Sequence, residues 1–316
     1  MNLDPRPTRA SSLVLFVVPS FIWGTTWLAI KFQLGVVEPE VSVAWRFALA
    51  AVLMIAVCLA KGVSLRYPLR DHLQFALLGF LLFGSNYVLV YKAEQHLTSG
   101  LVAVLFSFMV FWNLLGARIL FGTPAPRAVV AGAFLGVAGV ALLFWPEVAG
   151  LRSGTVPGEA LGMALAIVST LLASLGNLHS QALFARGVGV FPATALGMAW
   201  ASVLVALWCA VTGVPFSFDP RPAYVLSISY LAVFGSVVAF LSYLTLIRRI
   251  GSGRAGYTAA VIPAIAMAAS TLFEGYRWTA TALLGLGLVV AGTVLVLRAR
   301  QVATAVPAAP AQARAA

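Results

Sequence analysis

Apolar residues occur in long unbroken runs along this chain, and short polar segments separate one run from the next. A helix needs about 20 apolar residues to cross the roughly 30 Å hydrocarbon core of a bilayer, so runs of this length predict membrane-spanning helices. They are too long for the roughly ten-residue alternating segments of a membrane β-barrel. Ten spans are predicted, at residues 12–31, 40–60, 73–91, 98–117, 127–145, 159–181, 193–212, 224–247, 254–273 and 279–298.

The composition agrees with an all-α integral membrane fold. Apolar residues make up 61% of the 316 residues and charged residues only 9%, whereas soluble domains have about 45–50% and 25%. The net charge of +11 comes from basic residues that stand singly at the ends of apolar runs. A nucleic-acid-binding face would gather them on one surface, so the charge indicates a lipid bilayer as partner and no nucleic acid.

The positions of the basic residues predict the orientation of the chain. If both termini are cytoplasmic, Arg46 falls inside a span and 14 of the 20 basic residues lie on the inner side. This excess is what the positive-inside rule requires of a multi-pass protein of the plasma or inner membrane. The outer side holds Lys31, Lys92, Arg152, Arg221 and Arg277.

Residues 301–316 form an Ala- and Pro-rich tail, predicted to be disordered and cytoplasmic.

A weak internal repeat divides the chain. A shift of 153 residues lays 98–144 on 251–297 and matches Ser99 with Ser252, Gly132 with Gly285 and Gly139 with Gly292. We therefore expect two five-helix halves, residues 1–150 and 151–300. Because five is odd, the second half is inverted in the membrane, and inverted repeats place the substrate site of many transporters near the bilayer midplane.

Four stretches of sequence carry a family resemblance. They are FIWGTTWLAIK at 21–31, WRF at 45–47, AEQHLTSGLVAVLFS at 93–107 and RIGSGRAGYTAAVIPAIAMAASTLFEGYRWT at 249–279. In order and spacing they resemble the drug/metabolite transporter superfamily, in its EamA-type ten-helix branch. The resemblance implies transport of amino acids, nucleobases, sugars or toxic metabolites, often outward, through a central cavity.

The fourth span departs from the family pattern. Val110 and Phe121 stand where the repeat places Pro263 and Glu274. Pro263 lacks a backbone donor and is predicted to act as a hinge, since a cavity can satisfy the carbonyl that it frees. We therefore expect the first half to be the stiffer one.

Arg46 is the charge predicted to lie inside a span. A charge at mid-bilayer costs about 2.5–3.5 kcal/mol, so it is usually functional or paired. Two interpretations remain: Arg46 contacts a substrate or gate, or it is structurally paired or snorkels to the membrane surface. Contact with the substrate would favour a carboxylate-bearing one.

Other polar and aromatic side chains are candidates to line a substrate cavity. In the sixth span Thr170, Ser174, Asn177 and Gln181 share one helical face, which either borders a watery path or bonds to neighbouring helices. Trp and Tyr near span ends have membrane-belt anchoring as the alternative. The predicted substrate-cavity residues are Trp23, Thr26, Trp27, Arg46, Asn86, Tyr87, Ser107, Ser174, Asn177, Tyr243 and Tyr257.

The acidic residues lie at the ends of the predicted spans, so we expect no buried carboxylate. This favours exchange without a coupled proton, or coupling through a residue such as Glu94, Glu274 or His179. No HExxH, GxSxG or P-loop motif occurs, so no catalytic residue, metal or cofactor is expected. The sequence favours an exporter of a small metabolite such as an amino acid or related compound, working by alternating access. An integral membrane enzyme acting on a lipid or small molecule is the alternative, and a homodimer is left open.

Overall fold

The computed structural model describes residues 9–122, 127–143, 145, 157–256 and 258–298, and within these ranges the chain forms helices and no strands. A helix satisfies its backbone hydrogen bonds internally, which a segment surrounded by lipid requires. The first part contains α1 (Arg9–Lys31), α2 (Pro39–Ala60), α3 (Leu69–Leu78), η1 (Gly79–Gly84), α4 (Ser85–Glu94), α5 (Ser99–Phe106), α6 (Met109–Phe121) and α7 (Arg127–Leu143). The second part contains α9 (Pro157–Ala185), α10 (Val190–Thr212), α11 (Pro222–Tyr230), η2 (Leu231–Val238), α12 (Ala239–Ile250), α13 (Ser252–Ala255), α14 (Thr258–Phe273) and α15 (Ala280–Arg298).

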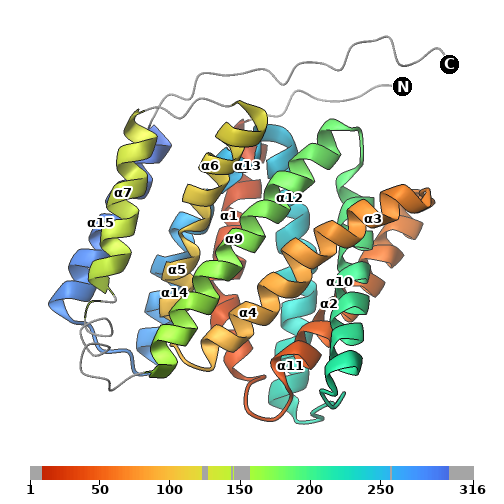
Figure 1. Ribbon diagram of the computed structural model, residues 1–316, viewed down its shortest axis with the longest axis horizontal. Coiled ribbons are helices and arrows are strands. Elements are labelled where there is room, and N and C mark those ends of the chain that lie inside the picture. Colours follow the sequence, from red (N-terminus) through yellow and green to blue (C-terminus); the bar gives the residue numbers. More distant parts are fainter. Residues whose placement is uncertain (1–8, 123–126, 144, 146–156, 257, 299–316) are drawn as a thin grey trace.

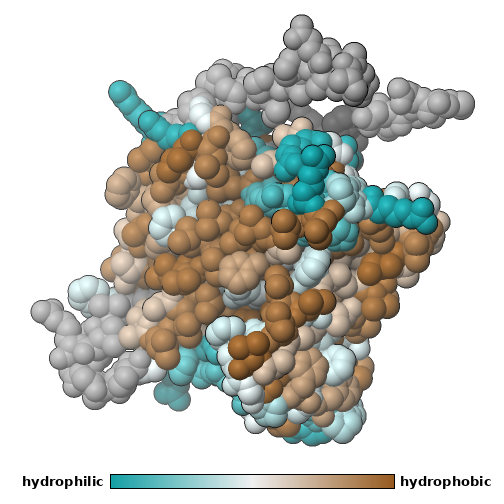
Figure 2. Space-filling view, turned by 45° about the vertical axis from the view of Figure 1, so that its right-hand side comes forward, coloured by the Kyte–Doolittle hydropathy of each residue, from teal (hydrophilic) through white to brown (hydrophobic). Residues whose placement is uncertain are grey.

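The helices coincide with the predicted apolar runs. Seven helical segments of the described chain are long and apolar enough to cross a membrane, and three further apolar helices are shorter: Arg127–Leu143, Ile262–Phe273 and Ala280–Gly292. The all-α membrane fold is confirmed, while the count of ten spans and the cytoplasmic termini stay predictions. Helix α1 begins and α15 ends at the same end of the bundle (Figure 1). On the face shown in Figure 2, apolar residues form a broad band and hydrophilic residues gather towards the two ends.

Helix α7 packs along α15 at one edge of the bundle (Figure 1). The two backbones touch: a Cβ on Gly139 would lie 2.5 Å from the carbonyl oxygen of Gly285, and one on Gly292 would lie 2.4 Å from that of Gly132. Small residues allow this approach, as at many helix contacts in membranes. Elsewhere α2 packs on α10, α4 on α9, and α1 on both α12 and α14.

Two long helical segments contain π-helical turns at their centres. Segment η1 joins α3 to α4, and η2 joins α11 to α12. Their starts, Gly79 and Leu231, are separated by almost the same interval as the internal repeat. Such wide turns disturb the regular α-helical hydrogen bonds and are frequent at functional sites. In η2 the carbonyl of Gly235 accepts a hydrogen bond from the Trp23 indole at 3.0 Å.

The helix that lacks the proline is the interrupted one. Helix α14 runs continuously through Pro263, whereas α5 and α6 are separated at Ser107 and Phe108. The Ser107 hydroxyl donates to the carbonyl of Val104 at 2.6 Å, and the amide of Ser107 bonds to the same carbonyl. A serine that bonds back to the preceding turn competes with the helix and bends it. The helix geometry therefore gives no support to a stiffer first half.

Candidate functional site

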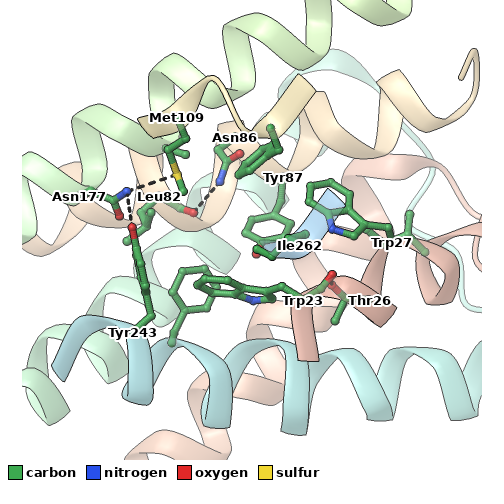
Figure 3. Close-up of a pocket in the computed structure, with 14 residues that line it drawn as sticks. Trp23, Thr26, Trp27, Leu82, Asn86, Tyr87, Met109, Asn177, Tyr243 and Ile262 are labelled. Carbon is green, nitrogen blue, oxygen red and sulfur yellow. Dashed lines mark hydrogen bonds between the residues drawn. The ribbon is translucent and has the colours of Figure 1, made fainter. Parts of the chain in front are cut away.

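A hollow lies between α1, η1 with α4, α5 with α6, α9, α12 and α14 (Figure 3). It contains about 500 Å³ of space outside the atoms, including space at its mouth. We call it the central cavity. Seven predicted residues line it: Trp23, Thr26, Trp27, Asn86, Tyr87, Asn177 and Tyr243. The remaining lining residues are Ile30, Leu82, Phe106, Met109, Ala173, Phe240 and Ile262.

Asn177 is the main polar group of the cavity wall. Its side-chain amide donates to the hydroxyl of Tyr243 at 3.0 Å and approaches Asn113 Oδ1 and Met109 Sδ at 3.4 Å each. Asn177 and Tyr243 are almost fully buried. Tyr243 is covered by protein, whereas belt aromatics contact the membrane surface, so its burial argues against belt anchoring.

Aromatic rings form the opposite wall. The ring of Trp23 meets Phe240 and Tyr243 edge to face, with centroids 5.0 and 5.1 Å apart. Trp27 packs against Phe106 at 5.1 Å. These are favourable geometries for aromatic pairs, and the rings give the cavity an apolar aromatic lining.

Arg46 lies behind this wall rather than in it. Its side chain is fully buried, with 0% exposure, which excludes snorkelling to the surface. The Nε atom donates to the Ser236 hydroxyl at 3.0 Å, and the guanidinium carbon lies 4.4 Å from the centroid of the Tyr87 ring. Neither Nη atom has a hydrogen-bond partner among the described residues. No carboxylate oxygen in the described chain lies within 4.0 Å of it either.

The remaining predicted site residues lie elsewhere. Ser107 borders a second hollow, where α5 and α6 face α7 and α15. Ser174 is buried on α9 and its hydroxyl has no hydrogen-bond partner within the described ranges. Pro263 is inside α14, next to the lining residue Ile262. Tyr257 and the tail at 301–316 lie outside the described residues.

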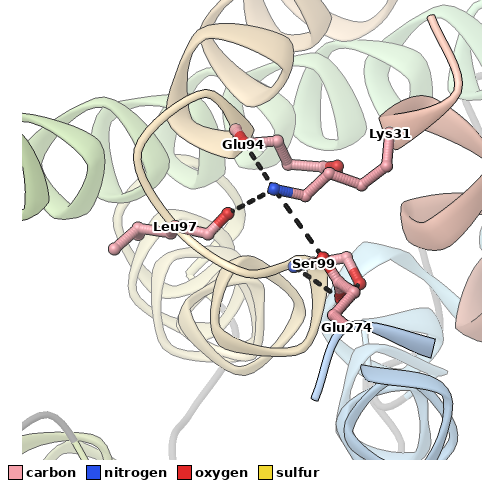
Figure 4. A network of polar contacts seen from close by, with 5 residues as sticks. All are labelled: Lys31, Glu94, Leu97, Ser99 and Glu274. Carbon is pink, nitrogen blue, oxygen red and sulfur yellow. Dashed lines mark hydrogen bonds and ion pairs between the residues drawn. The ribbon is translucent and has the colours of Figure 1, made fainter. Parts of the chain in front are cut away.

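An ionic cluster joins several helices towards one end of the bundle, and we call it the Lys31 clamp (Figure 4). The carboxylate of Glu274, at the end of α14, accepts hydrogen bonds from the backbone amide and the hydroxyl of Ser99 at the start of α5. The ammonium of Lys31 lies 3.7 Å from this carboxylate and donates to the carbonyls of Glu94 and Leu97 at 2.6 and 2.8 Å. The clamp thus ties α1, α4, α5 and α14 together.

The expectation of no buried carboxylate is wrong at Glu94. This residue ends α4, but its side chain is only 1% exposed, and neither carboxylate oxygen has a hydrogen-bond partner in the described structure. The chain continues beyond it to His96 and Leu97, which pack against Gly158 and Gly162 of α9. A position at the end of a span is therefore covered by protein here, which the linear sequence does not reveal.

The opposite end has a neutral counterpart, the Gln181 clamp. The side-chain oxygen of Gln181 accepts hydrogen bonds from the backbone amide and from the hydroxyl of Ser252, each at 2.7 Å. Ser252 opens α13 and is matched with Ser99 by the internal repeat. Nearer the start of α9, the hydroxyl of Thr170 accepts a hydrogen bond from the Trp112 indole at 3.2 Å. The polar face of α9 therefore bonds to neighbouring helices, and Asn177 also borders the cavity.

The EamA-like transporter family model matches this chain twice, at residues 10–145 and again at 160–298. The chain belongs to the EamA-like transporter family. The resemblance to drug/metabolite transporters is thereby confirmed, and the protein is a multi-pass membrane protein of the transporter type.

Relatives of this EamA-like chain have been named as transporters. It is 29% identical over 276 residues to the "Uncharacterized inner membrane transporter YedA" of Escherichia coli, covering 87% of each chain. It is 27% identical to the "Uncharacterized transporter YvbV" of Bacillus subtilis, over 92% of each. "Protein PagO" of Salmonella typhimurium is 21% identical over 92% of this chain and 94% of its own. The family and these names indicate a transporter rather than an enzyme, located in the inner membrane.

The same fold occurs in a crystal structure that superposes with a TM-score of 0.70. The match covers 93% of this chain and 100% of the other, at 22% sequence identity. At this identity the likeness shows the EamA-like fold alone.

Sequence reasoning did not identify the apolar part of the cavity lining. Residues such as Leu82, Phe240 and Ile262 resemble every other apolar residue of a span, and only packing separates those that face a cavity from those that face lipid. The sequence signal for the polar members was stronger, because a polar side chain in a span avoids lipid.

Proposed function

We propose that this chain exports a small metabolite, such as an amino acid or a related compound, by alternating access between two inverted halves. Each half comprises one family match, and the connection between them lies near residue 150. The observation that carries the proposal is a central cavity bordered by both halves, in a bundle that has a clamp towards each end.

The halves have the reciprocal contacts that a two-fold relation requires. The repeat matches Gly132 with Gly285 and Gly139 with Gly292, while the close contacts join Gly139 to Gly285 and Gly132 to Gly292. Each contact is thus the repeat-equivalent of the other, as at an isologous interface. Two states that open to opposite sides are then related by symmetry, which supports rocking of the halves around a fixed site.

The clamps supply the gates of this cycle. With the orientation that the basic residues predict, the Lys31 clamp faces outside and the Gln181 clamp faces the cytoplasm. Opening outward breaks the Glu274–Ser99 bonds, and opening inward breaks the Gln181–Ser252 bonds. The cavity is thereby exposed to one side at a time.

Equivalent glycines beside the clamps allow a matched test. A Cβ on Gly100 would lie 2.7 Å from Met267 Sδ and 2.9 Å from Ser270 Cβ, whereas one on Gly253 meets ordinary contacts at 3.6 Å and beyond. Gly100→Ala should push α5 away from α14 at the Lys31 clamp and impair transport. Gly253→Ala should transport as the wild type does.

The assay is uptake and counterflow of radiolabelled amino acids and related carboxylates in proteoliposomes, with chemical analysis of the recovered label. Counterflow of unaltered compound, impaired by Gly100→Ala alone, is the expected result. Altered product without net movement would instead establish the membrane-enzyme alternative.

A further inference from the structure

The central cavity has a mostly apolar lining, and the charge of Arg46 beside it has no ion-pair partner within 4.0 Å in the described part of the chain. We propose that its ligand is an organic anion with a flat apolar body and without an ammonium group, bound as a carboxylate under the field of Arg46. This inference rests on the proposed function for the site, and it narrows the class of substrate.

The charge is positioned beside the cavity by contacts from three elements. From α2, Arg46 stacks over the ring of Tyr87, a lining residue of α4. Its Nη2 atom lies beside Gly235 of η2, at 3.2 Å from where a Cβ would be, and the side chain of the lining residue Thr26 approaches the same point at 2.9 Å. The absence of a side chain at Gly235 is therefore what lets the guanidinium reach the wall at Thr26.

The guanidinium keeps unused binding capacity. A guanidinium has five N–H donors. The Nε of Arg46 bonds to Ser236 and the hydroxyls of Tyr87 and Tyr91 interact with the guanidinium, but neither Nη atom makes a well-aligned hydrogen bond in the described structure. The Nη atoms lie behind the cavity wall, so Arg46 acts on a ligand in the cavity through its charge. In a low-dielectric interior a charge without a contacting counter-ion is costly, and an anion entering the cavity would offset that cost.

The charge of Arg46 also acts on a ligand that it does not touch. Coulomb interactions are several times stronger at an effective dielectric constant of about 20 than in water. The lining contains no Asp or Glu, and the buried carboxylate of Glu94, on the same α4, interacts with the charges of Lys31, Glu274 and Arg46 from outside the lining. A ligand ammonium would therefore meet the repulsion of Arg46 with no carboxylate in the lining to bind it.

The rest of the lining fits the body of such a ligand. Trp23, Trp27, Phe106 and Phe240 present aromatic surfaces, with Ile30 and Ile262 beside them. The polar lining residues are Thr26, Asn86, Tyr87, Asn177 and Tyr243, and the side-chain oxygens of Asn86 and Asn177 have no partner in the described structure, so they suit neutral hydrogen-bonding substituents. The wall thus offers stacking surfaces, and Arg46 behind it supplies one positive charge.

Three indole compounds that differ in charge test this inference. They are indole-3-propionate, an anion; tryptophan, a zwitterion; and tryptamine, a cation. Binding to the purified full-length protein is measured by ligand-dependent thermal stabilisation, since a ligand that prefers the folded state raises its stability. Indole-3-propionate should bind about tenfold more tightly than tryptophan, with tryptamine weakest. Equal or tighter binding of tryptamine would overturn the proposal.

Variants assign the preference to Arg46. Arg46→Gln should remove the preference for the anion. Arg46→Lys should keep the order of binding of the three compounds at lower affinity. Ser236→Ala leaves the charge of Arg46 in place and should keep the preference for the anion. If Arg46→Gln does not fold, the ligand series on the wild type and on Arg46→Lys decides. An unchanged anion preference in folded Arg46→Gln refutes the role of this residue.

Flux separates this inference from the proposed function. Uptake of labelled indole-3-propionate and tryptophan into proteoliposomes is measured in parallel with binding. Binding of the anion without flux refutes transport but supports the anion site. Flux of tryptophan without any preference for the anion refutes the anion site but supports transport.

Discussion

Single polar groups define the chemistry of the cavity, because most of its wall is apolar. The hydroxyl of Tyr243 accepts one hydrogen bond from Asn177, and its ring packs on Trp23. The sequence indicated Trp23 and Asn177 because such residues are unusual within a span, and it indicated Tyr243 near a span end, with belt anchoring as the alternative. It could not identify the contact between Arg46 and Tyr87, which joins side chains from different helices.

Tyr243→Phe removes this hydroxyl and leaves the ring. Hydrogen bonds between membrane helices average about 0.6 kcal/mol, so the free energy of unfolding should fall by roughly that amount. Tyr224→Phe is the matched control, since the hydroxyl of Tyr224 bonds to Ser42 at 3.1 Å and Tyr224 does not line the cavity. Both variants should lose similar stability in thermal unfolding, but only Tyr243→Phe should alter ligand binding. A similar effect of both on binding would contradict a role for the cavity.

At the scale of elements, helices could be predicted from apolar runs, but their internal geometry could not. The π-helical turns η1 and η2 have no clear signature in composition. Pro263 predicted an irregular helix, and the break lies instead at Ser107 and Phe108. Local sequence gives the tendency to bend, while contacts with neighbouring helices decide where bending occurs.

The contact between α7 and α15 gives a prediction at this scale. Gly139→Ala and Gly285→Ala place a methyl group about 2.5 Å from a backbone oxygen, so the helices must separate. Gly136→Ala and Gly287→Ala are matched controls on the same helices, because a Cβ there meets nothing within 4 Å. The first pair should lower the thermal unfolding midpoint and the second pair should not. Equal midpoints for all four variants would show that the close approach does not stabilise the fold.

For the whole molecule, length and apolarity predicted the membrane fold, and the repeat predicted two matched halves. Orientation rests on the distribution of basic residues, which acts during insertion and leaves no trace in the packing. The clamps could not be read from the sequence, since Glu274 and Ser99 are brought together only by the fold.

Two exposed serines test the orientation. Ser64 lies in the segment between α2 and α3, predicted to be cytoplasmic, and Ser217 lies between α10 and α11, predicted to be outside. The native cysteines, Cys58 and Cys209, are buried. In intact cells a membrane-impermeant maleimide should label Ser217→Cys but not Ser64→Cys, and both should react after lysis. The reverse pattern would invert the topology and exchange the sides assigned to the two clamps.

The reciprocal contacts between Gly139 and Gly285 and between Gly132 and Gly292 have a consequence for the history of the chain. A contact that each half makes with the equivalent surface of the other does not require a covalent link. A half-length ancestor inserted in both orientations could have formed it with a second copy of itself. Gene duplication and fusion would then have fixed one partner in each orientation, after which the two could diverge. The two clamps are not such a pair, because the repeat places Phe121 opposite Glu274 and matches only their serines, Ser99 and Ser252.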